Sequence, residues 1–128
     1  MNLLLDTHAW LWFVLGDSRL SETAHQHIRD PNHVKYVSPA SYWEISIKIG
    51  LGKYALEGDY RAFMRKAIEG NGFRVLHITP SHTCRVAELP LHHRDPFDRL
   101  LIAQAMDEAM SVVSDDGNFS KYQIDVIW

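Results

Sequence analysis

The chain has 128 residues, which is long enough to bury one hydrophobic core without cross-links, so we expect a single domain over residues 1–128. Hydrophobic residues make up 46% of the chain and charged residues 23%, an ordinary composition for a globular protein. The single cysteine, Cys84, excludes an internal disulfide and a cysteine-rich zinc site, and a formal net charge of −3 excludes an overall basic protein.

No apolar run reaches membrane-spanning length, and the opening residues M-N-L-L-L-D lack the basic start of a signal peptide. We therefore expect a protein of the reducing cytoplasm that does not bind a membrane. The negative total charge still leaves room for a local basic edge that contacts nucleic acid.

Short apolar runs alternate with longer segments of helical periodicity. We predict strands at residues 3–5, 34–37, 73–78, 111–114 and 124–127, with the last one at an edge of the sheet. We predict helices at residues 9–15, 21–30, 38–49, 59–69, 79–89 and 95–106. Strands that alternate with helices favour βαβ units and a mainly parallel sheet covered on both faces.

The stretch from Leu91 to Met106 places two carboxylates at the start of a helix. Asp95 stands at the N-cap position, Pro96 at the first helical position and Asp98 at the third. The apolar residues that follow recur at helical spacing and anchor the helix in a core. The same pattern is also a good helix start, because both acids are favoured by the helix dipole, so a structural interpretation stays open.

Further acids fall near the carboxyl ends of predicted strands, where ligands bind in open α/β sheets. Asp6 directly follows the first strand, Asp116 closely follows the fourth, and Glu44 lies about a turn and a half into the helix after the second. Each also has a structural interpretation: Asp6 as a helix cap, Asp116 as a turn residue, and Glu44 as the partner of Lys48.

A cluster of these acids needs a counter-charge. Two carboxylates about 4 Å apart repel by roughly 4 kcal/mol at an effective dielectric constant near 20, so several cannot stay ionised together without a cation. An all-oxygen set of ligands prefers a hard ion such as Mg²⁺ or Mn²⁺ to zinc. Such an ion activates water and stabilises charge on a phosphoryl group, which favours metal-dependent hydrolysis of phosphodiester bonds.

Four sequence blocks carry a resemblance to a known family. They are L-L-L-D-T-H-A-W at the start, S-P-A-S-Y-W-E-I-S-I-K-I-G-L-G-K at 38–53, H-R-D-P-F-D-R-L-L-I-A-Q-A at 93–105 and V-V-S-D-D-G-N-F at 112–119. In this order they resemble PIN domains and, more narrowly, the VapC ribonuclease toxins of bacterial type II toxin–antitoxin systems. The resemblance implies an α/β protein with a three-layer α/β/α PIN-like fold and a mainly parallel sheet of about five strands.

The same resemblance implies a Mg²⁺- or Mn²⁺-dependent endoribonuclease that leaves a 5′ phosphate. Its catalytic and metal-binding residues, matched position by position, are Asp6, Glu44, Asp98 and Asp116. On this interpretation the first three bind the essential ion, and Asp116 helps to hold a second ion or orients water.

The helix acid does not match the family's spacing in full. In many relatives this acid stands three residues before the Ile of L-I-A, whereas Asp98 stands four before Ile102, so Asp95 stays open as an alternative ligand or a supporting residue. Ser38 and Ser114 precede metal-ligand positions and are expected to support the carboxylates.

Basic residues beside the acids are candidates for contacting RNA phosphates, namely His93, Arg94, Arg99 and Lys48. The alternatives are that Arg99 neutralises the adjacent Asp98 and that the others lie on solvated surfaces. The eight histidines do not predict a zinc site, because their pairs lie on different helix faces or lack a cysteine nearby.

The resemblance also implies two protein partners: a VapB-like antitoxin bound near the aromatic residues of the early helices, and a second copy in a homodimer. Alternative functions are a stand-alone PIN nuclease in RNA processing and a non-catalytic module that binds RNA or an antitoxin. A phosphotransferase of the haloacid dehalogenase type is disfavoured, because its second aspartate is replaced by His8.

Overall fold

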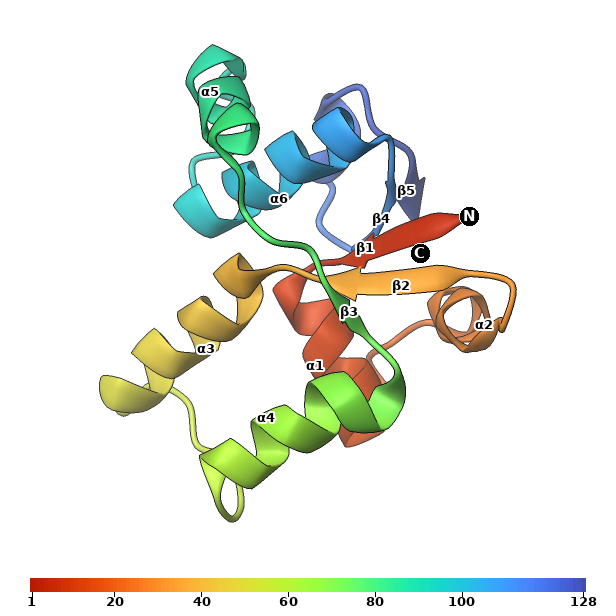
Figure 1. Cartoon of the computed structure of the whole chain (residues 1–128), viewed down its shortest axis with the longest axis vertical. Helices are drawn as coiled ribbons and strands as arrows, with labels where there is room; N and C mark the ends of the chain where they lie inside the picture. The colour runs from red at the N-terminus through yellow and green to blue at the C-terminus, as the bar shows by residue number, and fades with distance from the viewer.

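The computed structural model describes all residues from 1 to 128 and is built around a five-stranded sheet (Figure 1). The strands are β1 (Asn2–Leu5), β2 (Val34–Val37), β3 (Arg74–Val75), β4 (Ser111–Val113) and β5 (Val126–Ile127). Their order across the sheet is β3-β2-β1-β4-β5, and every pair is parallel. β1 therefore lies at the centre, and the predicted edge position of the last strand is confirmed.

Helices supply most of the crossovers that parallel strands require. They are α1 (Thr7–Leu15), α2 (Glu22–Arg29), α3 (Pro39–Gly50), α4 (Tyr60–Ile68), α5 (Pro80–Glu88) and α6 (Pro96–Glu108). Each begins after a polar N-cap whose side chain accepts a first-turn N–H, at Asp6, Ser21, Ser38, Asp59, Thr79 and Asp95. None of these helices combines the length and the apolar character needed to cross a membrane.

The two faces of the sheet bury separate hydrophobic cores, as the alternation along β1 illustrates. Leu3 and Leu5 pack with side chains of α1, α2 and α4. Leu4 points to the other face and packs with side chains of α5 and α6. All three leucines are fully buried, and helices lie on both sides of the sheet in Figure 1, so the predicted three-layer α/β/α fold is confirmed.

The third strand is shorter than the sequence predicts. Of the predicted residues 73–78, only Arg74–Val75 pair with β2. The reason is that β2 itself ends at Val37, whose carbonyl oxygen accepts the Leu76 N–H at 2.9 Å as the last link between the two segments. The fifth strand is likewise reduced to Val126–Ile127, and the sheet is entirely rather than mainly parallel.

Candidate active site

The carboxyl ends of the two central strands bring acidic residues to one edge of the sheet. β1 and β4 pair with Leu5 beside Val113, so Asp6 and the segment after Val113 leave the sheet side by side. The Asp6 N–H donates to the Val113 carbonyl at 3.1 Å and extends this pairing. Glu44 from α3 reaches the same edge through Thr7, the neighbour of Asp6, whose hydroxyl lies 2.9 Å from Glu44 Oε1. Asp98 from the first turn of α6 reaches it through His93, whose Nε2 contacts both Asp98 and Asp116.

Asp6 is almost completely buried, with 4% of its surface exposed. Its Oδ1 accepts the Ala9 N–H at 2.8 Å, which begins α1 at Thr7, two residues earlier than predicted. Burial raises the pKa of Asp6 from 3.8 to about 6, although hydrogen bonds from Ser114 and Ala9 oppose the rise. One Asp6 oxygen therefore caps a helix, while the carboxylate as a whole is costly to ionise without a nearby cation.

Glu44 is held in place by two neighbouring side chains, Thr7 and Lys48, and is 7% exposed. The Thr7 hydroxyl lies 2.9 Å from Glu44 Oε1 and 3.0 Å from Ser41 Oγ. Lys48 Nζ lies 3.0 Å from Glu44 Oε2, so the helix-neighbour pairing considered from the sequence is present. Thr7 and Ser41 were not among the predicted site residues, although Ser41 stands one helical turn before Glu44 on the same face.

Asp98 lies among four other carboxylates. Its pKa is raised from 3.8 to about 8, mainly by burial and then by the charges of Asp95, Asp6, Glu44 and Asp116. The charges of these four acids act in the same direction as burial, because both disfavour the ionised form of Asp98. The pairing of β1 with β4 independently sets Asp6 beside the segment that leads to Asp116.

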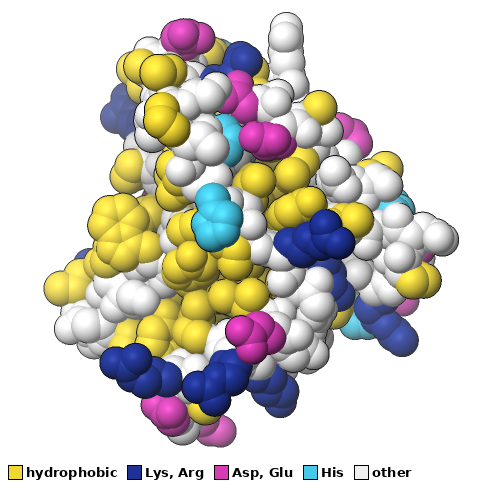
Figure 2. All heavy atoms as spheres, in the orientation of Figure 1, with side chains coloured by type: hydrophobic (Ala, Val, Ile, Leu, Met, Phe, Trp, Pro, Cys, Tyr) yellow, Lys and Arg dark blue, Asp and Glu magenta, His cyan; other side chains and the backbone are white.

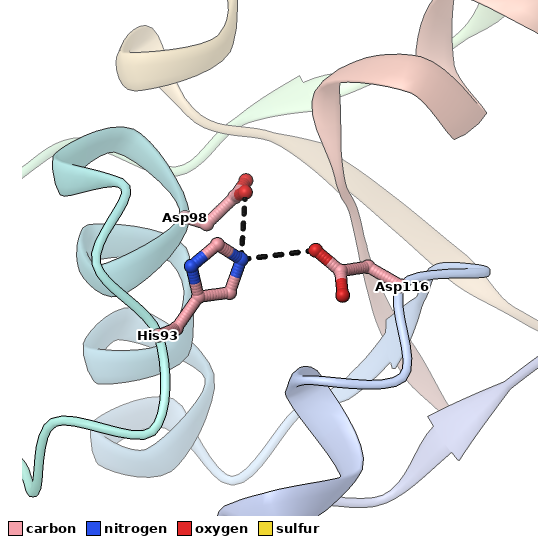
Figure 3. Close-up of side chains that lie close together, drawn as sticks. All are labelled: His93, Asp98 and Asp116. Carbon is pink, nitrogen blue, oxygen red and sulfur yellow. Dashed lines mark hydrogen bonds and ion pairs between the residues drawn. The ribbon is translucent and has the colours of Figure 1, made fainter.

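His93 lies between Asp98 and Asp116 (Figure 3). Its Nε2 is 3.0 Å from Asp98 Oδ2 and 2.9 Å from Asp116 Oδ2. Asp116 is fixed further by the Asn118 N–H, which donates to Oδ1 at 2.9 Å, and by Ser114 Oγ, which accepts the Asp116 N–H at 3.1 Å. His93 was predicted to face RNA, and in this structure its ring faces the acids.

Asp95 and Ser38, which we expected to support the site, act as helix caps. Asp95 Oδ1 accepts the N–H groups of Phe97 and Asp98, at 2.9 and 3.0 Å, and begins α6. Ser38 is fully buried, and its Oγ accepts the Ala40 N–H at 3.1 Å without a hydrogen bond to a carboxylate. Asp95 still affects the site, because its charge raises the pKa of Asp98.

The Arg99 guanidinium holds the loop between α5 and α6. Its Nη1 donates to the carbonyl oxygens of Pro90 and His93, both at 3.1 Å, and its Nη2 to those of Val86 and Leu89, at 3.1 and 3.3 Å. Both terminal nitrogens are therefore occupied by the backbone, which differs from the phosphate contact that the sequence suggested.

Tyr122 holds the same loop from the other side. Its hydroxyl donates to the Pro90 carbonyl at 2.7 Å and accepts the N–H groups of His92 and His93, at 3.1 and 2.9 Å. Tyr122 was not predicted, since no local pattern marks a residue that meets its partners only through the fold. Arg94 is exposed and makes no ion pair, so it is free to contact a ligand.

The donor set fits a hard divalent cation. The clustered acids are all oxygen ligands, which suit Mg²⁺ and Mn²⁺. Burial raises the pKa of both Asp6 and Asp98, so added positive charge beside them favours their ionised forms. Ligand atoms of His93, Asp98 and Asp116 also lie within 4.8 Å of one another, which is close enough to share an ion.

Exposed hydrophobic side chains lie beside the site. Trp43, next to Glu44, is 61% exposed and packs edge-to-face on Phe97, with ring centroids 5.5 Å apart. Figure 2 shows hydrophobic side chains spread over the region of α3, α4 and β3, with Lys and Arg side chains near its lower border. An exposed apolar area of this kind is typical of a surface that binds another protein.

Solved structures of VapBC and Fit proteins have a similar fold. VapBC2 from Rickettsia felis, solved with a promoter DNA fragment, has a TM-score of 0.72 at 13% identity and covers 98% of this chain and 97% of its own. VapBC-1 from nontypeable Haemophilus influenzae has a TM-score of 0.70 at 15% identity, and the match covers 98% of this chain and 96% of that chain. FitAcB from Neisseria gonorrhoeae has a TM-score of 0.64 at 16% identity, and the match covers 97% of this chain and 95% of that chain.

At these identities the likeness concerns the fold, and no curated protein matches the chain by sequence. The family model of the PIN domain matches residues 3–125, which is nearly the whole chain. The match includes β2, β3, β4, all but the first residue of β1, and the four predicted acids, and it ends directly before β5. The chain therefore belongs to the PIN-domain family.

Proposed function

We propose that this protein is a divalent-metal-dependent endoribonuclease and the toxin of a type II toxin–antitoxin pair. PIN domains are nucleases, and the match to the family covers almost the whole chain. The observation that supports the proposal is the position of the acids at one edge of the sheet: Asp6 leaves β1 beside the end of β4, and His93 Nε2 lies within 3.0 Å of both Asp98 and Asp116. Hydrolysis of a phosphodiester bond is the reaction that such a group of acids serves best.

Asp6, Glu44 and Asp98 are the residues that would hold Mg²⁺ or Mn²⁺. The bound ion supplies a more acidic water and positive charge beside the phosphate. Asp116 helps to hold a second ion or orients water. The Thr7 hydroxyl fixes the Glu44 carboxylate, and Ser114 supports both Asp6 and Asp116 through the hydrogen bonds described above.

The substrate in this proposal is RNA, which approaches the edge of the sheet that carries the acids. Arg94 is exposed, and the Lys48 side chain is 39% exposed while it pairs with Glu44, which supports a contact of both with backbone phosphates. The exposed Trp43 ring offers a flat surface on which an unpaired base can stack. The choice of RNA over DNA rests on the resemblance to VapC toxins.

The proposed partners are a VapB-like antitoxin and a second copy of the chain, in a cytoplasmic complex. The apolar surface over α3 and α4 supports a protein partner, because exposed area of this kind is costly in water. The structural neighbours named above are themselves complexes of VapBC or Fit proteins. A short basic, DNA-binding protein encoded beside this chain would favour the toxin over a stand-alone RNA-processing nuclease.

The proposal is tested by following cleavage of labelled RNA by the purified protein with Mg²⁺, Mn²⁺ or EDTA. Asp6→Asn keeps a side-chain oxygen for the α1 cap but removes the charge, so we expect a folded protein whose cleavage falls to the EDTA level. Asp59→Asn is the matched control, since Asp59 caps α4 on an exposed surface and should cut like the wild type. Full metal-dependent cleavage by Asp6→Asn would refute the proposal.

The position of cleavage is found by sequencing RNA ends after brief expression of the wild type and of Asp98→Ala. Ends that carry a 5′ phosphate and occur only with the wild type are the expected result. If wild-type and variant cells give the same ends, the protein is a non-catalytic module that binds RNA or an antitoxin, and the ribonuclease assignment is wrong.

A further inference from the structure

The charge of this protein works against its proposed substrate. The chain has a net charge of −3, and the proposed active site is itself made of acids, so both repel the phosphates of RNA. Binding of RNA therefore needs cationic side chains that the protein has not already neutralised. The positions of the Lys and Arg side chains show where such free cations lie.

Six of the thirteen Lys and Arg side chains are engaged within the protein. They are Arg19, Lys48 and Arg85 in ion pairs, Arg99 and Lys121 in hydrogen bonds, and Lys35 over two aromatic rings. The other seven are exposed and have neither an ion pair nor a side-chain hydrogen bond, namely Arg29, Lys53, Arg61, Arg65, Lys66, Arg74 and Arg94. Five of these seven free cations fall within residues 53–74.

The free cations thus concentrate on α4 and the segments beside it. Residues 48–74 contain six Lys or Arg residues but three Asp or Glu residues, which gives this segment a net charge of +3. Arg61 and Arg65 stand one turn apart on the exposed side of α4, and Lys66 follows them. Figure 2 shows Lys and Arg side chains at the lower border of this face, where Figure 1 shows α4.

The acids closest in sequence leave these cations free. The two Asp59 oxygens accept the N–H groups of Arg61 and Ala62, both at 3.3 Å, as the cap of α4. Glu69 stands one turn after Arg65 and forms no ion pair with it. Arg61 and Arg65 line an open pocket of about 620 Å³ together with Asp59, Tyr60 and Met64. Like charges one helical turn apart repel, so an anionic group bound by both arginines offsets that repulsion.

α4 is anchored on the helix that carries Glu44. The Tyr60 hydroxyl lies 2.7 Å from Ser46 Oγ and donates to the Tyr42 carbonyl at 3.3 Å. Tyr42 and Ser46 stand two residues before and two residues after Glu44 on α3. The start of α4 therefore lies beside the part of α3 that reaches the acids, and an RNA strand bound at the acids can continue over α3 to α4.

From these positions we infer that Arg61, Arg65 and Lys66 form a second RNA-binding surface, which holds backbone phosphates away from the acids. The inference rests on the proposed ribonuclease function and deepens it. Contacts to phosphates do not read the base sequence, so this surface contributes affinity for an RNA strand and leaves the choice of cleavage site to other residues.

Binding of a fluorescent single-stranded RNA of about 16 nucleotides is the direct test, measured by anisotropy in EDTA at several KCl concentrations. Arg61→Gln/Arg65→Gln should bind about tenfold more weakly at low salt. The slope of log affinity against log salt should fall by about 1.4, since each phosphate contact to a single strand contributes about 0.7.

Arg19→Gln/Arg29→Gln is the matched control. It removes the same charge from two exposed arginines outside residues 48–74, so its slope should stay within about 0.3 of the wild-type slope. Circular dichroism should show that both variants keep the wild-type helix content, because all four arginines are exposed.

Cleavage kinetics with Mn²⁺ give a second readout. Arg61→Gln/Arg65→Gln should raise KM for the longer RNA about tenfold and leave kcat within about twofold, because the two arginines do not touch the reacting phosphate. An RNA of about four nucleotides covers less of the surface, so most of the difference between variant and wild type should disappear.

The outcomes separate this inference from the proposed function. Equal salt slopes in wild type and variant, equal losses in variant and control, or a wild type that does not bind the RNA would each overturn the α4 surface. A wild type that binds RNA with the expected slopes but cuts none with any metal would overturn the ribonuclease function and leave the α4 surface in place.

Discussion

Asp98 combines two effects that act in the same direction, burial and the repulsion of neighbouring carboxylates, and its pKa rises to about 8. The unfolded chain has an ordinary carboxyl near 3.8, so between these values the folded protein holds a proton that the unfolded protein has released. Proton uptake on folding stabilises the protein at low pH and is lost as the pH rises. Asp6, whose pKa rises to about 6, contributes in the same sense.

We therefore expect the free energy of unfolding in EDTA to fall between about pH 4 and pH 8, against the usual trend for paired carboxylates. Urea denaturation followed by circular dichroism at several pH values measures it. Saturating Mg²⁺ should remove most of the fall, because the ion stabilises the ionised acids. Asp98→Asn should flatten the upper part of the curve, and an unchanged curve in this variant would contradict the assigned pKa.

At the scale of elements, α6 has two distinct tasks. Its first turn presents Asp98 to His93, with Asp95 as the cap that begins the helix. Through Arg99, one turn of the same helix holds the end of α5 and the loop that carries His93. The helix therefore links the stability of the loop to the geometry of the site.

Substitutions at Asp95 and Asp98 distinguish the roles of the two acids at the start of α6. Asp95→Asn keeps an oxygen for the cap, so we expect near wild-type stability and most of the RNA cleavage, whereas Asp95→Ala should lose about 1 kcal/mol of stability. Asp98→Asn should lose cleavage while staying folded. Cleavage rates and urea midpoints measured on all three variants show which of the two acids is the metal ligand. A stable but inactive Asp95→Asn protein would identify Asp95 as the ligand.

The clamp formed by Arg99 is tested by Arg99→Lys. Lysine has one ammonium where arginine has a planar fork, so it cannot reach the four carbonyl oxygens at once. We expect a loss of at least about 2 kcal/mol in the free energy of unfolding, measured in urea. Arg94→Lys, on the exposed neighbour, should stay within about 0.5 kcal/mol of the wild type. Equal losses would show that the clamp contributes nothing.

At the scale of the whole molecule, β1 joins two cores that share no side chain. Leu3 and Leu5 belong to one core and Leu4 to the other, and Asp6 stands directly beyond them at the edge of the sheet. The position of Asp6 is thus fixed by packing on both faces at once. The site depends on the central strand as much as on its own hydrogen bonds.

Leu4→Ala should therefore destabilise the protein by about 2–5 kcal/mol, the usual cost of a cavity at a fully buried leucine. Thermal and urea denaturation measure this loss. Leu91→Ala is the control, because Leu91 is 78% exposed and its removal should change stability by less than about 0.5 kcal/mol. A Leu4→Ala protein as stable as the control would contradict the two-core description.

The sequence by itself determined the class of fold, the six helices and the acids of the candidate site. These features follow from local patterns, namely the spacing of apolar residues, N-cap residues such as Ser38 and Asp95, and acids that follow a strand. The lengths of β3 and β5 were overestimated, because a strand also ends where its neighbour stops pairing, which no local pattern records.

Only the tertiary structure decided which of these residues meet. The parallel pairing of β1 with β4 sets Asp6 beside the loop of Asp116, although more than a hundred residues separate them. We expected His93 to contact RNA, but the packing places its ring between Asp98 and Asp116. Arg99 and Tyr122 hold the His93 backbone there through hydrogen bonds. Such contacts depend on how distant segments pack in three dimensions, and distance along the chain does not encode them.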